Sequence, residues 1–142
     1  MHDARERGLK VICVDPRRTE TARLADIHLQ VRPGEDPTLL AGMLRVILDE
    51  GLFDADFCAQ HVEGLEELRT AIDGFTPAYV ERRAGVPADR MIAAARLFAA
   101  GPRGCASSGT GPDMAPRPNL TEHLISCLNT VCGRCAREGE TV

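Results

Sequence analysis

The stretch that decides the fold runs from Leu9 to Asp36 and reads LKVICVDPRRTETARLADIHLQVRPGED. Residues 11–14 form a short apolar run rich in β-branched side chains, which is typical of a parallel strand buried on both faces. Pro16 ends this strand, because proline cannot continue a strand ladder. Residues 27–31 alternate apolar and polar side chains, which predicts a second, half-exposed strand. A short helical connector over residues 19–25 would join the two strands.

The remainder of the chain predicts mainly helices. Asp36 and Pro37 have the residue types preferred at an N-cap and at the first helical position, and an apolar stripe follows them to residue 50. Gly8 is expected to cap the last turn of a helix over residues 3–7, which is too short to be stable alone. Further helices are predicted over 54–61, 64–73, 76–85 and 87–101 and from Asn119 or Thr121 to 133, with a strand over 103–107 and a glycine loop over 108–112.

Composition limits the classes of protein to consider. Hydrophobic residues make up 44% and charged residues 27% of the 142 positions, which is typical of a globular domain. Tryptophan is absent and aromatic residues are only 4%, so the core must be aliphatic. The net charge of −4 and the scattered cations argue against nucleic-acid binding. No apolar run approaches the roughly 18–20 residues that a membrane span needs.

The first candidate site is the turn that follows the first strand. Asp15 and Pro16 stand at the carboxyl end of a buried parallel strand, where open α/β sheets hold a nucleotide ribose on an acidic residue. Arg17 and Arg18 offer guanidinium groups and Thr19 a hydroxyl, which suit phosphate and guanine. The alternative is a plain strand-ending turn with solvated arginines, since Asp-Pro turns are common.

Two further turns are candidate ligand contacts. Gly34 and Asp36 precede a predicted helix, whose N-terminus attracts polar and anionic groups, although Asp36 can equally serve as an ordinary helix cap. Gly109 and Gly111 flank Thr110 in a loop where glycine permits a ligand to approach the backbone closely. A Gly-x-Gly pattern alone is more often only a turn.

The cysteines allow a metal-site hypothesis. The spacing Cys127-x4-Cys132-x2-Cys135 is similar to that of plant-type ferredoxins, and Cys105 would have to supply a fourth ligand. Cys127, however, falls within an apolar helical run, where cysteine behaves as a small hydrophobe. The pattern therefore favours reduced structural thiols over an iron–sulfur or zinc protein, and it favours a cytoplasmic setting.

Three stretches carry a family resemblance. Residues 14–43 (VDPRRTETARLADIHLQVRPGEDPTLLAGM), 75–99 (FTPAYVERRAGVPADRMIAAARLFA) and 109–119 (GTGPDMAPRPN) resemble, in this order, the central segment of the molybdopterin oxidoreductases. This is the family of the formate dehydrogenases, nitrate reductases and dimethyl sulfoxide reductase. The resemblance implies an α/β fold with a Rossmann-like parallel sheet and flanking helices. It also implies an internal fragment of a larger multidomain enzyme, in which residues 1–101 belong to the cofactor-binding domain and 102–142 lead toward its neighbour.

The resemblance also implies a cofactor, bis(molybdopterin guanine dinucleotide) with molybdenum or tungsten, and two-electron redox or oxygen-atom transfer in the full-length enzyme. By this resemblance the Asp15–Thr19 turn contacts the guanosine, and Gly34 and Asp36 contact the guanine. The loop at 109–111 and Met114 lie near the pterin and metal. Thr110, Met114 and Glu35 depart from the residues that the family usually has at these positions.

The same resemblance sets expectations about what lies outside this chain. A 4Fe–4S cluster is expected in the full-length enzyme but not on these residues, and no catalytic residue or metal ligand is recognised here. The isolated chain is therefore expected to be inactive and to act with the remaining domains and with electron-transfer subunits. A periplasmic location is also compatible with this sequence if a twin-arginine signal lies upstream of it. The competing hypothesis is a self-standing, non-enzymatic nucleotide-binding module that uses Asp15 and Asp36.

Overall fold

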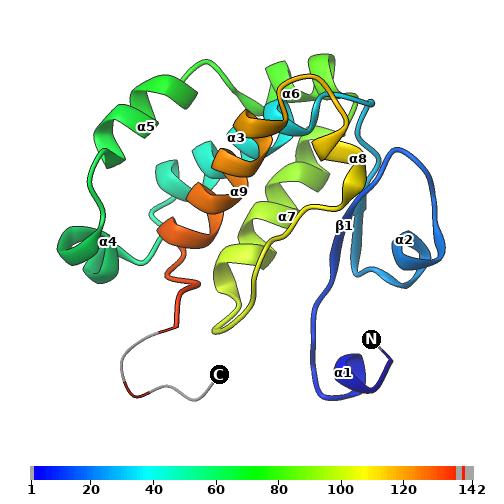
Figure 1. Cartoon of the computed structure of the whole chain (residues 1–142), viewed down its shortest axis with the longest axis horizontal. Coiled ribbons are helices and arrows are strands. Elements are labelled where there is room, and N and C mark those ends of the chain that lie inside the picture. The colour runs from blue at the N-terminus through cyan, green and yellow to red at the C-terminus, as the bar shows by residue number, and fades with distance from the viewer. Residues whose placement is uncertain (1, 137–138, 140–142) are drawn as a thin grey trace.

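The computed structural model describes residues 2–136 and 139 and shows a mixed α/β chain that is mostly helical (Figure 1). In Figure 1 the two strands and α2 lie at one side of the molecule, and α4 and α5 lie at the opposite side. The elements are α1 (His2–Glu6), β1 (Ile12–Val14), α2 (Glu20–Leu24), β2 (Ile27–Leu29), α3 (Asp36–Asp49), α4 (Ala55–His61), α5 (Leu65–Ile72), α6 (Pro77–Ala84), α7 (Ala88–Ala100), α8 (Thr110–Asp113) and α9 (Pro118–Val131).

The sheet confirms the predicted parallel pair with a helical connector, but β1 is not buried on both faces as predicted, because no described element covers Val14, which is exposed. β1 and β2 pair in parallel with Ile12 opposite Ile27, and α2 crosses between them. Thr19 caps α2, because its hydroxyl accepts a hydrogen bond from the backbone N–H of the third residue along. β2 ends two residues earlier than predicted, because the Val31 N–H turns back to the Leu29 carbonyl. The described residues contain these two strands and no further one.

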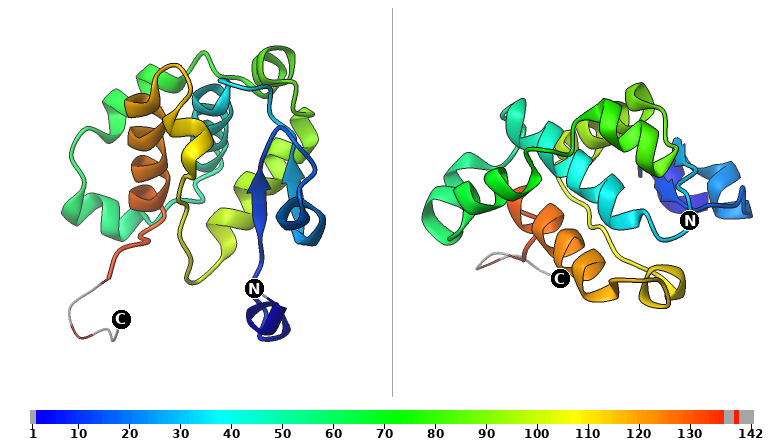
Figure 2. Two further views of the ribbon diagram at one scale, coloured as in Figure 1. Left: turned by 45° about the vertical axis from the view of Figure 1, so that its right-hand side comes forward. Right: turned by 90° about the horizontal axis from the view of Figure 1, so that it is seen from above.

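Helix α3 is the centre of the hydrophobic core. Most of its residues are buried, and α5, α6, α7 and α9 all contact it (Figure 2). The helices approach closely at Gly42, where an added Cβ would lie 2.5 Å from Val80 Cγ2 on α6 and 3.2 Å from Met91 Sδ on α7. The absence of a side chain at Gly42 therefore lets three helices pack closely.

Several helix ends confirm local sequence signals. The side chains of Asp54 and Thr76 each accept a hydrogen bond from the backbone N–H three residues later, at 3.0 and 3.2 Å. Gly85 ends α6 at φ +76°, and Gly8 follows α1 at φ +96°. Glycine adopts this left-handed conformation at little steric cost, which explains why the sequence places it after these helices.

Other predictions near helix starts were wrong. Asp36 is the first residue of α3, and Glu35 occupies the cap position without a side-chain cap bond. Neither Asn119 nor Thr121 caps α9; both lie within its first turn, and Arg117 precedes the helix at φ +67°. The polar residue types suggested caps, but Thr121 is buried and its hydroxyl instead donates to the Arg117 carbonyl at 3.4 Å.

The segment before α9 also differs from expectation. Residues 103–107 do not form a strand, because the small side chains meet no partner strand among the described residues. The predicted glycine loop contains a short helix, α8, which begins at Thr110. α9 packs on α3, while the proposed boundary between residues 101 and 102 stays a prediction. In the part of the chain that the structure describes, no helix has the length and apolar character required to cross a membrane.

Candidate functional site

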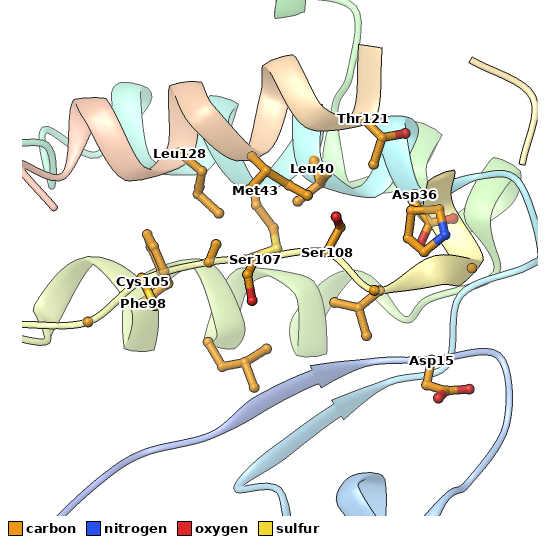
Figure 3. Close-up of a pocket in the computed structure, with 18 of the residues that line it drawn as sticks. Asp15, Asp36, Leu40, Met43, Phe98, Cys105, Ser107, Ser108, Thr121 and Leu128 are labelled. Atoms are coloured by element: carbon orange, nitrogen blue, oxygen red, sulfur yellow. The ribbon is translucent and has the colours of Figure 1, made fainter. Parts of the chain in front are cut away.

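A cleft of about 1760 Å³ opens between the end of β1, the start of α3 and the segment from residue 100 to residue 117 (Figure 3). Apolar side chains line its inner part, with Leu40 and Met43 from α3, Phe98 from α7 and Leu128 from α9. The cleft is larger than the roughly 300–1000 Å³ that accommodates most small ligands. It therefore has room for an extended ligand, and Asp15 and Asp36 lie toward one end of it (Figure 3).

The cleft brings together residues that the sequence analysis selected from three distant segments. Arg18 and Thr19 are not among them: Arg18 is exposed elsewhere on the turn, and Thr19 is used as the cap of α2. Their predicted contacts with a cofactor stay a prediction that the lining of this cleft does not support. The predicted residues that do line it are Asp15, Pro16, Arg17, Gly34, Asp36, Gly109, Thr110, Gly111 and Met114.

Side chains of β2 and its extension fix the turn after β1. Asp15 Oδ1 accepts a hydrogen bond of 2.7 Å from the Arg17 N–H, which closes the turn. His28 Nε2 donates to the Asp15 carbonyl at 2.8 Å, and Gln30 Nε2 donates to the Pro16 carbonyl at 3.0 Å. Sequence reasoning missed both residues and treated them only as the polar half of an alternating strand. Their position on the neighbouring parallel strand was the available signal.

The turn before α3 is held by an ion pair. The Glu35 carboxylate accepts hydrogen bonds from Thr38 Oγ1 at 2.7 Å and from Arg83 Nε at 3.1 Å, and Arg83 Nη2 lies 3.0 Å from its other oxygen. Glu35 and Asp36 both line the cleft, and the Glu35 carboxylate is engaged within the protein. Burial, followed by the negative charge of Glu35, raises the pKa of Asp36 above its ordinary value.

Nothing in the described chain requires glycine at positions 109 and 111. Gly109 has φ −118°, which any residue adopts, and an added Cβ at either glycine would meet no atom within 4 Å. Met114 nearby is 81% exposed. Neither backbone conformation nor internal packing therefore explains these glycines, whereas close approach by a ligand would.

An asparagine on α9 holds the opposite wall of the cleft. Asn129 Oδ1 accepts from the Ala106 N–H at 2.7 Å, and Asn129 Nδ2 donates to the Ala106 carbonyl at 2.8 Å. These two bonds satisfy the backbone of an extended segment much as a neighbouring strand would. Ser107 and Ser108 follow Ala106 along this wall of the cleft (Figure 3). The sequence analysis did not identify Asn129, since its partner lies 23 residues away.

The cysteines lie in different environments. Cys105 is exposed and lines the cleft, Cys127 is half-buried with Sγ 3.6 Å from His123 Nε2, and Cys132 is buried. All six cysteines are free. Within residues 2–136 and 139, no three His, Cys, Asp or Glu side chains are grouped so that they could hold a metal ion.

Cys132 should make folding stability depend on alkaline pH. Burial raises the pKa of its thiol to about 11, whereas an unfolded thiol ionises near ~8.5. As the pH rises, the thiol of the unfolded state therefore loses its proton before that of the folded state. The contribution of the neutral Cys132 thiol to the free energy of unfolding is complete below pH ~8.5 and is lost as the pH rises toward 11. Urea unfolding between pH 8 and 11 should show a fall of about 3 kcal/mol more in the wild type than in Cys132→Ala. Cys135→Ala, which removes an exposed thiol, should leave the wild-type slope unchanged.

Comparison with known proteins gives consistent similarities. The chain is 43% identical to formate dehydrogenase H of Escherichia coli over 97 residues, which are 68% of this chain and 14% of that enzyme. It is 34% identical to the molybdopterin-containing subunit of thiosulfate reductase from Salmonella typhimurium over 137 residues, 96% of this chain and 18% of that subunit. No protein-family profile matches the chain.

The fold agrees with the sequence similarity. Acetylene hydratase from Pelobacter acetylenicus matches with a TM-score of 0.92 and 31% identity, over 96% of this chain and 19% of that protein. The chain thus spans one fifth or less of these relatives, with 14% to 19% of their length covered. Similarity in sequence and in fold leads to the same conclusion: the chain belongs to the molybdopterin oxidoreductase family.

Proposed function

We propose that this chain forms part of the cofactor-binding surface of a molybdenum or tungsten oxidoreductase that uses bis(molybdopterin guanine dinucleotide). The observation that carries the proposal is the convergence of the turns at 15–17, 34–36 and 109–111 on one cleft. When bound, the cofactor supplies two-electron redox or oxygen-atom transfer chemistry, and the protein binds and orients it. In this proposal the chain contributes no catalytic side chain of its own.

The groups in the cleft suit the guanosine end of such a cofactor. Asp15 uses Oδ1 to close its turn, and Oδ2 has no partner among the described residues, so it can accept hydrogen bonds from ribose hydroxyls. Asp36 can accept from the N–H groups of a guanine, and Arg17, which has no carboxylate partner in the described chain, can bind phosphate. The apolar side chains of the inner cleft would exclude water from a bound ligand.

The finer architecture is also a proposal. The parallel pair β1–α2–β2 is the type of unit from which a Rossmann-like sheet is built. We propose that residues 1–101 belong to such a domain and that 102–142 lead toward a neighbour. We further propose that the full enzyme carries a 4Fe–4S cluster elsewhere, works with other domains and electron-transfer subunits, and is cytoplasmic.

Substitution of Asp15 tests the ligand assignment. GDP should bind the full chain more tightly than ADP in titration calorimetry, and Asp15→Ala should weaken GDP binding about tenfold by removing hydrogen bonds to a charged acceptor. Asp15→Asn keeps an acceptor for the Arg17 N–H and should give a smaller loss. Asp89→Ala, an exposed change on α7 outside the cleft, is the matched control. Equal affinity for GDP and ADP, or an equal loss with the control, would contradict the assignment.

Sequencing the DNA on both sides of this reading frame tests the multidomain context. In-frame sequence that encodes a Cys-x-x-Cys cluster motif upstream and another large domain downstream would support a complete enzyme of this family. Stop codons directly on both sides would instead favour the self-standing nucleotide-binding module. The GDP measurement would then be the appropriate assay for that module.

A further inference from the structure

A second hollow, of about 760 Å³, lies beside the cleft and shares Pro16, Arg17 and Pro33 with it. We propose that this hollow binds a phosphate group, either inorganic phosphate or the phosphate of a small monoester. Three arginines line it, Arg17, Arg32 and Arg90, and no carboxylate does. We call it the arginine hollow. Arg17 also lines the cleft, but Arg32 and Arg90 do not, so two of the three arginines are independent of the cofactor assignment.

The charge of the arginine hollow is unbalanced. Arg17, Arg32 and Arg90 are exposed, and no described carboxylate forms an ion pair with any of them. The chain as a whole carries a net charge of −4, so a concentration of three cations is not a general property of its surface. Cations gathered without a counter-charge repel one another, and a bound dianion would turn this repulsion into attraction.

Backbone groups hold the guanidinium of Arg32 in place. Arg32 Nη1 donates to the carbonyls of Arg82 and Arg83 at 2.8 and 3.0 Å, where α6 ends. Its guanidinium lies across Gly85, where an added Cβ would come within 3.1 Å of Arg32 Nε. Carbonyls fix the guanidinium without neutralising it, so its remaining N–H groups are available to an anion. A cation that is already positioned loses little conformational freedom on binding.

The other two arginines approach from different elements. Arg17 is on the turn that His28 and Gln30 hold through the Asp15 and Pro16 carbonyls, and Arg90 is in the first turn of α7. Donors from separate elements can surround a tetrahedral oxyanion, and guanidinium groups bind phosphate oxygens in a bidentate manner. The lining contains no Phe, Tyr or Trp side chain on which a nucleic-acid base could stack. These features together favour a phosphate group as the ligand.

Titration of the full chain with inorganic phosphate, and separately with glycerol 3-phosphate, tests the proposal by ¹H–¹⁵N correlation NMR. We expect saturable shifts at the backbone amides of Val31, Gly85 and Arg90, and the probe with the larger effect identifies the source of the phosphate. Arg90→Gln should weaken binding about tenfold, because it removes a charged donor. Arg23→Gln, an exposed arginine on α2 outside both hollows, is the matched control.

The result also separates this site from the cofactor cleft. Arg90→Gln should leave GDP affinity unchanged, since Arg90 does not line the cleft. The proposal is overturned if neither probe gives saturable shifts, if the shifts are confined to cleft residues such as Gly109, or if Arg23→Gln weakens binding as much as Arg90→Gln. Failure of GDP to bind would count against the proposed function and not against the arginine hollow.

Discussion

Replacing Gly42 with leucine should lower the free energy of unfolding by about 3 kcal/mol or more, since overpacked cores must distort to admit new atoms. Even a bare Cβ at this position would lie 2.5 Å from Val80 Cγ2, well inside van der Waals contact. A leucine would force α6 and α7 away from α3, and the greater helix propensity of leucine offsets only about 1 kcal/mol. Urea denaturation followed by circular dichroism measures the change.

Gly74→Leu provides the control for Gly42→Leu. An added Cβ at Gly74 would meet nothing within 4 Å, and its φ is outside the left-handed region. We expect this variant to remain within about 0.5 kcal/mol of the wild type, as for most surface substitutions. Equal losses in the two variants would show that the close approach of α3 and α6 is not what requires glycine at position 42.

Replacing Asn129 with leucine should cost about 3 kcal/mol and also weaken ligand binding in the cleft. Leucine has a similar shape but can make neither bond to Ala106, so one backbone N–H and one carbonyl lose their partners. Each partly buried polar group left unsatisfied costs about 1–3 kcal/mol. The freed segment would no longer hold Ser107 and Ser108 in the cleft wall. Urea denaturation gives the stability, and GDP titration gives the effect on binding.

The control for Asn129→Leu is Asn119→Leu, which makes the same substitution at an exposed position of the same helix. It should change both quantities little. If Asn129→Leu were as stable as this control, the two hydrogen bonds to Ala106 would contribute nothing to folding. If stability fell while GDP affinity stayed the same, the 103–108 segment would not form part of the binding surface.

Local chemistry explains why much of the fold could be predicted. The start of α4 depends on the adjacent Asp54, whose carboxylate accepts from the backbone N–H three residues later, and the end of α6 depends on the backbone freedom of Gly85. The two strands were recognisable from β-branched and alternating residues at Ile12–Val14 and Ile27–Leu29. Each of these signals lies within a few residues of the feature that it specifies.

Features that depend on distant partners could not be predicted in the same way. The extended segment at 103–107 looked like a strand, but the partner that satisfies Ala106 is a side chain on α9. Similarly, Arg117 and not a polar cap residue precedes α9, where the chain turns sharply at φ +67°. Tertiary packing determines such features, and local sequence propensity carries no information about it.

In the candidate site, too, some features follow from local sequence and others do not. Asp15, Asp36 and Gly109 were selected from turn chemistry and family resemblance, and all three line the cleft. Arg18 and Thr19 were included because they continue the same turn, but the turn directs them elsewhere. Sequence order alone cannot tell which side of a turn faces a ligand.

The central position of α3 has a consequence for how the molecule opens. Because α5, α6, α7 and α9 all pack against this one helix, none of them can move away without exposing its apolar surface to water. Local fluctuations should therefore be confined to peripheral elements such as α1, whereas α3 with the helices on it should unfold as one cooperative unit. Leu40 and Met43 on α3 are buried in the core and also line the cleft. Any change that loosens the packing of α3 should therefore disturb the candidate site together with the whole fold.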